Sequence, residues 1–159
     1  MRANQVFSVR GANPDEADGL VTLMQEFYAE SSHELDVAWA RASLIALLAN
    51  PPRGKVWIAD SQGVPAGYAV LTVRYTMEFG GLSGYVDDLF VRPGFRRQGA
   101  GRALLDQLFE ECHARDCKSV QVEVGEGNAA ARALYADFGL VARQDGRVLL
   151  CGPVSRGRP

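Results

Sequence analysis

The stretch "RPGFRRQGAGRALL" (residues 92–105) holds four arginines and three glycines in fourteen positions. It follows an apolar segment, "YVDDLFV" (residues 85–91), that is typical of a strand, and it leads into a helical pattern of apolar residues. A strand, a glycine-rich loop and a helix in this order present free backbone N–H groups at the positive end of the helix. The stretch therefore predicts an anion-binding loop, because glycines let a phosphate approach the backbone closely.

Two helices are predicted on the N-terminal side of this loop. A strand over residues 6–10 precedes "NPDE" (residues 13–16), where Asn13, Pro14 and Glu16 form the pattern of a capping box. Apolar residues recur at helical spacing over residues 20–28 and again over residues 44–48. Pro51 and Pro52 end the second helix.

Three successive strands then lead to the loop. They are "KVWIAD" (55–60), "AGYAVLTVRYT" (66–76) and "SGYVDDLFV" (83–91), separated by turns at Gln62-Gly63 and Gly80-Gly81. After the loop we expect a helix over residues 103–112, a strand "KSVQVEV" (118–124) and a helix "NAAARALYADFG" (128–139). "LVAR" (140–143), an Asp145-Gly146 turn and "RVLLCG" (147–152) predict a final hairpin. This order predicts an α/β fold with a mixed sheet, antiparallel at first and parallel at the glycine loop.

Two nucleotide-binding motifs fail at this loop. Gly94 and Gly99 match the front half of a P-loop, but Ala100 and Gly101 stand where that motif requires Lys and Ser or Thr. A dinucleotide-binding fingerprint needs a small third residue, and Leu104 is too large for the close helix–strand packing. A triphosphatase and a dinucleotide enzyme are therefore both disfavoured. A plain strand–helix turn with solvated arginines stays open as the bland interpretation.

"RRQGAG" fits the pattern Arg-x-x-Gly-x-Gly, and with it the chain resembles the GCN5-related N-acetyltransferase (GNAT) superfamily. The resemblance extends to the acidic strand "YVDDLFV" before the loop, to "VQVEV" after it, and to the spacing of Asn128, Tyr135, Phe138 and Gly139. It covers nearly the whole chain, and its specific part is residues 85–140. It implies a GNAT-like mixed, mostly antiparallel sheet, with a central pair of splayed parallel strands and helices on both faces.

The resemblance also implies that acetyl-coenzyme A is the acyl donor and that no metal is required. Strand 85–91 is expected to carry a bulge and to splay from "VQVEV", which leaves a slot for the pantetheine arm. Backbone groups of Leu89 and Val91 are expected to bind that arm, and the glycine loop to bind the pyrophosphate. The residues assigned to cofactor binding are Leu89, Phe90, Val91, Arg96, Arg97, Gln98, Gly99, Ala100, Gly101, Arg102, Asn128 and Ala131.

Direct acetyl transfer to a primary amine needs a base for the amine and an acid for the departing thiolate. Tyr135 stands where the family places its acidic tyrosine, although a core tyrosine on an amphipathic helix fits the same position. For the base, Asp87 is the first candidate and Glu78 the second. Asp87 and Asp88 are adjacent in a strand and point to opposite faces, so at most one faces the slot.

The acceptor is expected to be a small cationic amine. In this family the first two helices shape the acceptor entrance, where this chain has Glu30, Glu34 and Asp36. The same carboxylates also fit an ordinary solvated helix face. Two other functions stay open: a non-catalytic coenzyme A-binding module, and an acyltransferase that acts on a protein N-terminus or a lysine.

Composition sets the remaining expectations. With 159 residues, 47% hydrophobic residues and a formal net charge of -2, we expect one domain over residues 1–159, with a frayed tail at 155–159. The small net charge gives no reason to expect affinity for nucleic acid, and no apolar run is long enough for a membrane span. A cytoplasmic location is expected, since no apolar leader is seen and the three cysteines form no CxxC pair. Family analogy predicts a homodimer.

Overall fold

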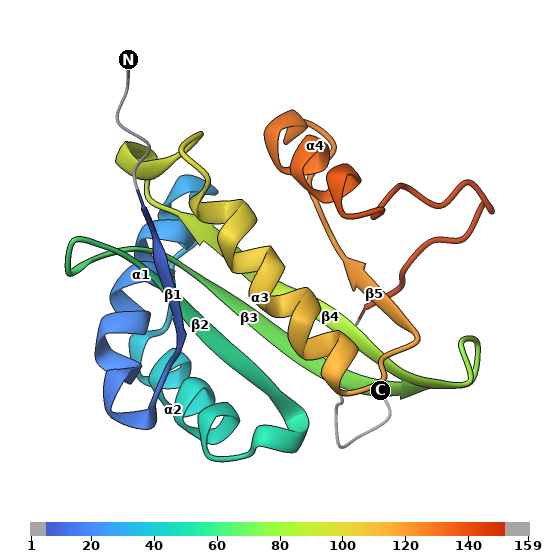
Figure 1. Cartoon of the computed structure of the whole chain (residues 1–159), viewed down its shortest axis with the longest axis horizontal. Helices are drawn as coiled ribbons and strands as arrows, with labels where there is room; N and C mark the ends of the chain where they lie inside the picture. Colours follow the sequence, from blue (N-terminus) through green and yellow to red (C-terminus); the bar gives the residue numbers. More distant parts are fainter. Residues whose placement is uncertain (1–5, 152–159) are drawn as a thin grey trace, which may run out of the picture.

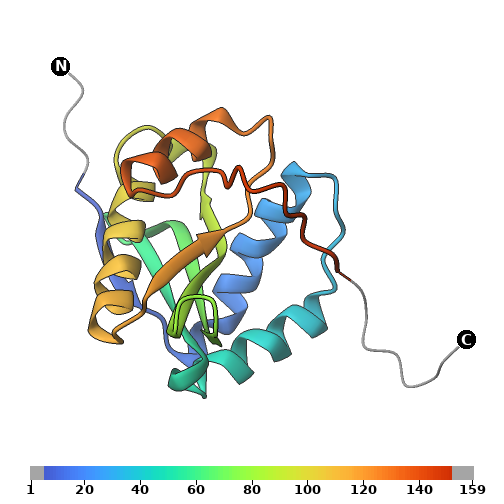
Figure 2. The ribbon, with the colours of Figure 1, turned by 90° about the vertical axis from the view of Figure 1, so that its right-hand side faces the viewer.

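The computed structural model describes residues 6–151, which form a five-stranded sheet with helices on both faces (Figures 1 and 2). The strands are β1 (Ser8–Gly11), β2 (Gly54–Ser61), β3 (Val64–Thr76), β4 (Gly81–Val91) and β5 (Ser119–Val122). The α-helices are α1 (Ala17–Glu30), α2 (Val37–Leu48), α3 (Ala100–Ala114) and α4 (Ala129–Asp137). The sheet order follows the chain, and only β4 and β5 are parallel, joined through α3. The predicted mixed sheet is confirmed.

Each of the first two helices is preceded by a capping residue, of which the sequence pattern predicts the first, Asn13, but not the second, Asp36. The backbone N–H of Asn13 donates to Glu16 Oε2 (2.9 Å) ahead of α1. The N–H of Trp39 donates to Asp36 Oδ1 (3.0 Å) at the start of α2. α2 then ends before Pro51, which opens a short 3-10 turn.

The sheet separates two hydrophobic cores, because successive side chains of a strand alternate between its faces. On one face, α1 and α2 pack against strand residues that include Val56, Ile58, Tyr68, Val70 and Phe90. On the other face, α3 and α4 pack against Trp57, Ala69, Leu71 and Val86. Figure 2 shows the sheet between these two groups of helices.

The predicted final hairpin is wrong. Residues 140–151 contain no regular secondary structure, and β5 is consequently an edge strand of the described sheet. The Asp145-Gly146 turn is present, since Asp145 Oδ1 accepts the N–H of Arg147 and Gly146 has a φ of 72°. However, the flanking apolar side chains bury no common face: Val148 is 80% and Leu150 86% exposed. Without that burial nothing holds the two arms in register.

Smaller differences concern the chain ends and the position of the parallel pair. The first strand is shifted to Ser8–Gly11, and the predicted tail at 155–159, like Gly152 of the hairpin, lies outside the described residues. The parallel pair lies at the edge of the sheet rather than at its centre, because the hairpin does not cover β5. Within residues 6–151, no helix combines the length and the apolar character that crossing a membrane requires.

Candidate active site

Strand β4 carries a bulge at Asp87, as the resemblance implies. In the β3–β4 ladder Leu71 lies opposite Val86 and Val70 lies opposite Asp88, which leaves Asp87 as the extra residue. One extra residue reverses the alternation of side chains from that point onward. Val86 therefore packs into the core beneath α3, whereas Asp88 lies on the face of the sheet that α1 covers.

The parallel pair separates at the bulge. Pairing between β4 and β5 is confined to Ser83–Val86 and Ser119–Val122. From Leu89 to Val91, β4 is paired with β3 alone, and its other edge is open along the described chain. The side chain of Phe90 is buried beside α1, while Leu89 and Val91 are half-buried on the α3 side. An open backbone edge between two splayed strands fits an extended, amide-containing ligand such as a pantetheine arm.

The glycine loop presents a row of free N–H groups. Gly99 lies in the left-handed region (φ 99°) and caps α3, and the side chain of Gln98 donates to the carbonyl of Gly94 (2.9 Å). Within residues 6–151, the backbone amides from Arg97 to Arg102 donate to no protein acceptor. Free amides at the start of a fifteen-residue helix provide a site for a phosphate or diphosphate group.

The arginines of the loop are mostly engaged within the protein. Three of them form ion pairs with carboxylates of α1 or α4: Arg92 with Glu26, Arg96 with Glu30, and Arg102 with Asp137. Arg96 also donates to the carbonyl of Val91 (2.7 Å). Arg97 is exposed and has no partner among the described residues. The guanidinium left free for an incoming anion is therefore that of Arg97.

Asp88 is the perturbed carboxylate of the site. Its Oδ2 accepts a hydrogen bond from the hydroxyl of Tyr68 (2.9 Å), and its side chain is half-buried. Burial raises the pKa of Asp88 to about 6; the Tyr68 hydrogen bond opposes this shift and the charge of Asp87 adds to it. Asp87 itself is exposed at the bulge. Asp88 therefore has the pKa of a base that works near neutral pH.

Tyr135 lies on α4, in the core on the α3 side of the sheet, and the charge of Asp88 acts on its hydroxyl. Asn128 Oδ1 accepts the N–H of Ala131 (3.1 Å) and so fixes the start of that helix. Burial, and secondarily the charge of Asp88, raise the pKa of Tyr135 to about 12. Its hydroxyl has no protein hydrogen-bond partner within residues 6–151. A phenol in this setting stays protonated at neutral pH and can donate to a ligand.

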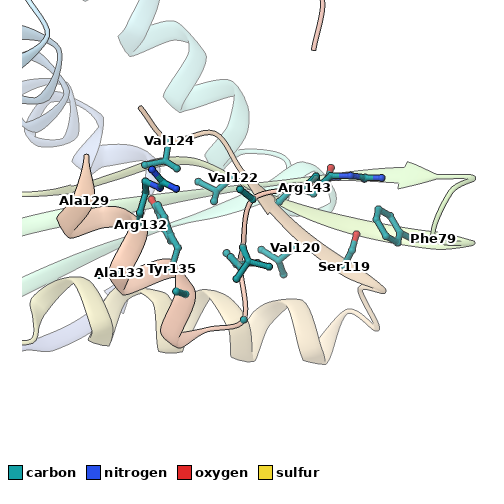
Figure 3. A pocket seen from close by; sticks show the side chains of 16 residues that line it. Phe79, Ser119, Val120, Val122, Val124, Ala129, Arg132, Ala133, Tyr135 and Arg143 are labelled. Carbon is teal, nitrogen blue, oxygen red and sulfur yellow. The ribbon is translucent and has the colours of Figure 1, made fainter. Parts of the chain in front are cut away.

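A groove of about 900 Å³ runs along the outer edge of β5 beneath α4. It is lined by Val120 and Val122 of β5, by α4 residues that include Tyr135, and by residues 139–143. Figure 3 shows the ring of Tyr135 extending from α4 toward Val122 and Val124. Arg132 is the cation at the α4 end of this groove. The groove thus reaches the phenol along the outer edge of β5, which no strand covers in the described sheet.

The structure does not bring the other proposed acids to this centre. Glu78 lies at the β3–β4 turn, where ion pairs with Arg143 and Arg147 lower its pKa. On the α1–α2 side, Asp36 is the N-cap of α2, and Glu34 is exposed without a partner in the described chain. Glu30 is paired with Arg96, so one of the three carboxylates of the expected acidic entrance is neutralised.

Sequence reasoning did not single out Asp88, Tyr68 or Tyr28 as site residues. Tyr28 of α1 has a raised pKa because of burial and of the charges of Asp88 and Asp87. The only sequence signal for this cluster is the pair of carboxylates in an apolar strand. Which carboxylate faces α1 depends on the position of the bulge. No group of three or more His, Cys, Asp or Glu side chains in residues 6–151 is arranged to hold a metal ion.

The sequence model of the Acetyltransferase (GNAT) family matches residues 20–140. The ribosomal protein bS18-alanine N-acetyltransferase of Escherichia coli K12 is 44% identical over 52 residues. That alignment covers 33% of this chain and 35% of the relative, so it spans about a third of the relative's length.

Two solved structures share the fold. An integron cassette protein from the mobile metagenome of Cole Harbour Salt Marsh superposes with a TM-score of 0.81 at 34% identity, covering 94% of this chain and 91% of its own. A predicted acetyltransferase from Clostridium acetobutylicum, solved with acetyl-CoA, has a TM-score of 0.76 at 18% identity, covering 91% of this chain and 96% of its own.

Proposed function

The chain belongs to the GNAT acetyltransferase family, and we propose that it transfers an acetyl group from acetyl-coenzyme A to a primary amine. The observation that carries this proposal is the convergence at one place of three features. These are the free amides of the α3 loop, the open edge of β4 beyond its bulge, and two groups able to transfer protons, the Asp88 carboxylate and the Tyr135 phenol.

The residues present fit the donor. Acetyl-coenzyme A supplies a diphosphate, an arm with two amides and a reactive thioester. The amides from Arg97 to Arg102, with the guanidinium of Arg97, suit the diphosphate. The open edge of Leu89–Val91 suits the arm, and an N–H there suits the thioester oxygen, where negative charge gathers in the transition state.

Asp88 and Tyr135 supply the two proton transfers. The amine nitrogen attacks the thioester carbonyl carbon and the carbon–sulfur bond breaks. Asp88 takes up a proton of the amine, which requires its ionised form and hence a pH above about 6. Tyr135 donates from its hydroxyl to the departing sulfur, because its raised pKa of about 12 keeps it protonated. Asp88 thus replaces the neighbouring Asp87 as the preferred base in this proposal.

The pKa of Asp88 favours an α-amine over an alkylamine as the acceptor. An N-terminal amine has a pKa near ~8 and a lysine or polyamine amine near ~10.4, so at neutral pH the α-amine has a neutral fraction a few hundredfold larger, roughly 10^2.4. A base with a pKa of about 6 is better matched to the first. The groove along the free edge of β5 could receive the peptide behind such an amine. The protein acceptor in the name of the E. coli relative agrees with this choice.

A small cationic amine is the second candidate, and Glu34 and Asp36 are the observation that favours it. Their carboxylates lie on the α1–α2 side without a cationic partner in the described chain. The pairing of Glu26 and Glu30 with loop arginines leaves this attraction weaker than the sequence indicates.

The test is release of coenzyme A thiol with a panel of acceptors at two salt concentrations. The panel has an alanine-initiated peptide, the same peptide with a blocked N-terminus and one lysine, and a polyamine. We expect the free α-amine to give the highest kcat/KM, with little effect of salt. A salt-sensitive preference for the polyamine would assign the second candidate instead. If no acceptor released thiol while coenzyme A still bound, the chain would be a binding module.

A further inference from the structure

The partner of Asp88 is a tyrosine with little freedom to move. Tyr68 of β3 is fully buried, and its ring lies 6.3 Å from that of Phe90, its cross-strand neighbour. Phe90 in turn stacks on Phe27 of α1 (5.5 Å). The ring of Tyr68 is thus packed among apolar side chains, and its hydroxyl donates to Asp88 Oδ2 (2.9 Å). It is the only protein donor to that carboxylate within residues 6–151.

We propose that Tyr68 is a positioning residue, whose buried hydroxyl fixes the orientation of the Asp88 carboxylate and keeps it ionised for proton transfer. The inference rests on the proposed function. Donation to one oxygen, Oδ2, leaves Oδ1 free to accept a proton from the acceptor amine. Tyr68 does not itself contact the reacting atoms in this proposal.

The hydrogen bond from Tyr68 matters because no cation near Asp88 stabilises the ionised carboxylate. Four titratable groups face the carboxylate: Tyr28 of α1, Tyr68 of β3, Asp87 of β4 and Tyr135 of α4. None of them is a cation, and no Lys or Arg of the described chain forms an ion pair with Asp88. Burial and the charge of Asp87 both favour the protonated carboxyl, so the Tyr68 hydroxyl is what opposes them.

The test is Tyr68→Phe, which removes the hydroxyl and keeps the ring. The hydrogen bond stabilises the charged carboxylate, so its loss raises the pKa of Asp88. We expect the acid limb of kcat/KM against pH to move to higher pH. The fractional loss of rate is then largest below neutral pH and becomes smaller as pH rises. The matched control is Tyr75→Phe on the same strand, where the ring is 66% exposed; it should leave the profile unchanged.

A second readout does not depend on activity. The carboxyl carbon of Asp88, followed by carbon-13 NMR, should titrate at higher pH in Tyr68→Phe than in the wild type. In the unmodified protein, the ring carbon bonded to the Tyr68 hydroxyl should report the Asp88 midpoint, and Asp88→Asn should abolish that response. This measurement tests the contact even where Tyr68→Phe does not fold.

The outcomes separate this inference from the proposed function. An acid limb that disappears in Asp88→Asn but stays in place in Tyr68→Phe overturns the positioning role and leaves the function intact. A uniform loss of rate at every pH, with no change in the Asp88 titration, also overturns it. Absence of turnover in the wild type overturns the proposed function, and the NMR titration then still supports or refutes the Tyr68–Asp88 contact.

Discussion

Strand β4 is paired on both edges before Asp87 and on one edge after it. Before the bulge, Ser83 and Gly84 lie between β3 and β5, and the hydroxyls of Ser83 and Ser119 are 2.6 Å apart in the interior. After the bulge, the carboxylate of Asp88 accepts a single hydrogen bond, from Tyr68, and the edge of β4 that faces β5 is unpaired in the described sheet.

The difference shows how one strand can serve two purposes. The doubly paired half satisfies its backbone groups and buries its side chains, which stabilises the fold. The singly paired half leaves backbone groups and a perturbed carboxylate accessible to ligands. Substitutions in the first half should therefore change the free energy of unfolding, and substitutions in or near the second half should change binding and rate.

The largest effect is expected for Asp88→Asn. The amide keeps the size of the side chain but cannot take up the amine proton. We expect kcat/KM at pH 8 to fall by about 10²–10⁴-fold, and the acid limb near pH 6 to disappear. Steady-state kinetics across about pH 5–9 provide the measurement, because this range includes the pKa of Asp88, about 6, and that of an α-amine. Asp87→Asn is the matched control, and a larger loss from Asp87→Asn would return the role of base to that residue.

The same substitution should stabilise the fold at high pH. The pKa of Asp88 in the folded protein, about 6, is above its ordinary value of 3.8, so folding disfavours the ionised form. This carboxyl therefore reduces stability progressively as the pH rises from 3.8 to about 6, and by a constant amount at higher pH. We expect Asp88→Asn to raise the free energy of unfolding by about 1–3 kcal/mol at pH 8 and by little at pH 4. Urea denaturation at both pH values measures it; equal effects at the two would be inconsistent with a raised pKa.

Tyr135→Phe should come next, with a loss of up to about a hundredfold in kcat. The hydroxyl has no protein partner in the described chain, so its removal leaves no unsatisfied group and the fold should be unaffected. Calorimetry should show an unchanged affinity for coenzyme A, since the hydroxyl acts only as the sulfur departs. Wild-type turnover in a folded variant would remove Tyr135 from the mechanism.

Gly84→Ala probes the doubly paired half. A Cβ there would lie 2.6 Å from Cys112 Sγ and 3.1 Å from Leu71 Cδ1, which is too close in a packed core. We expect a loss of about 1–3 kcal/mol in the free energy of unfolding, with turnover of the folded fraction preserved. The double variant with Cys112→Ala should recover part of the loss, because the sulfur is then absent. Additive effects in that cycle would show that the clash is not the cause.

Arg97→Ala should give the smallest effect, confined to cofactor affinity. Arg97 is the loop arginine without a partner among residues 6–151. A charged hydrogen bond to phosphate contributes about 1.5 kcal/mol or more, roughly tenfold in Kd. Arg102→Ala is the control, because that guanidinium is paired with Asp137. A greater loss of coenzyme A affinity from Arg102→Ala would mean that this ion pair opens on binding.

Much of the architecture can be predicted from local patterns. The capping residue Asn13, the turn at Gln62-Gly63 and the glycine loop each depend on contacts within a few positions of the chain. The final hairpin is the instructive failure. Its turn forms, but its arms need a partner strand, and only the packing of residues 140–151 decides whether they pair.

The candidate site divides in the same way. The amides around Gly99 and the position of Tyr135 on a capped helix follow from spacing along the chain. The partners of the loop arginines do not, since Glu26 and Glu30 are 66 positions away and meet them only in the folded chain.

The sequence by itself predicted most of the order of elements and an anion-binding loop, because these depend on local periodicity and on the conformational freedom of glycine. The family was indicated by the resemblance of its motifs to those of the GNAT superfamily. Only the tertiary structure decided which aspartate is perturbed. A single unpaired residue in the β3–β4 ladder turns Asp88 toward α1 and Tyr68, where burial raises its pKa to about 6. The register of two strands and the burial of a side chain are properties of the packed chain, and the sequence of one strand does not contain them.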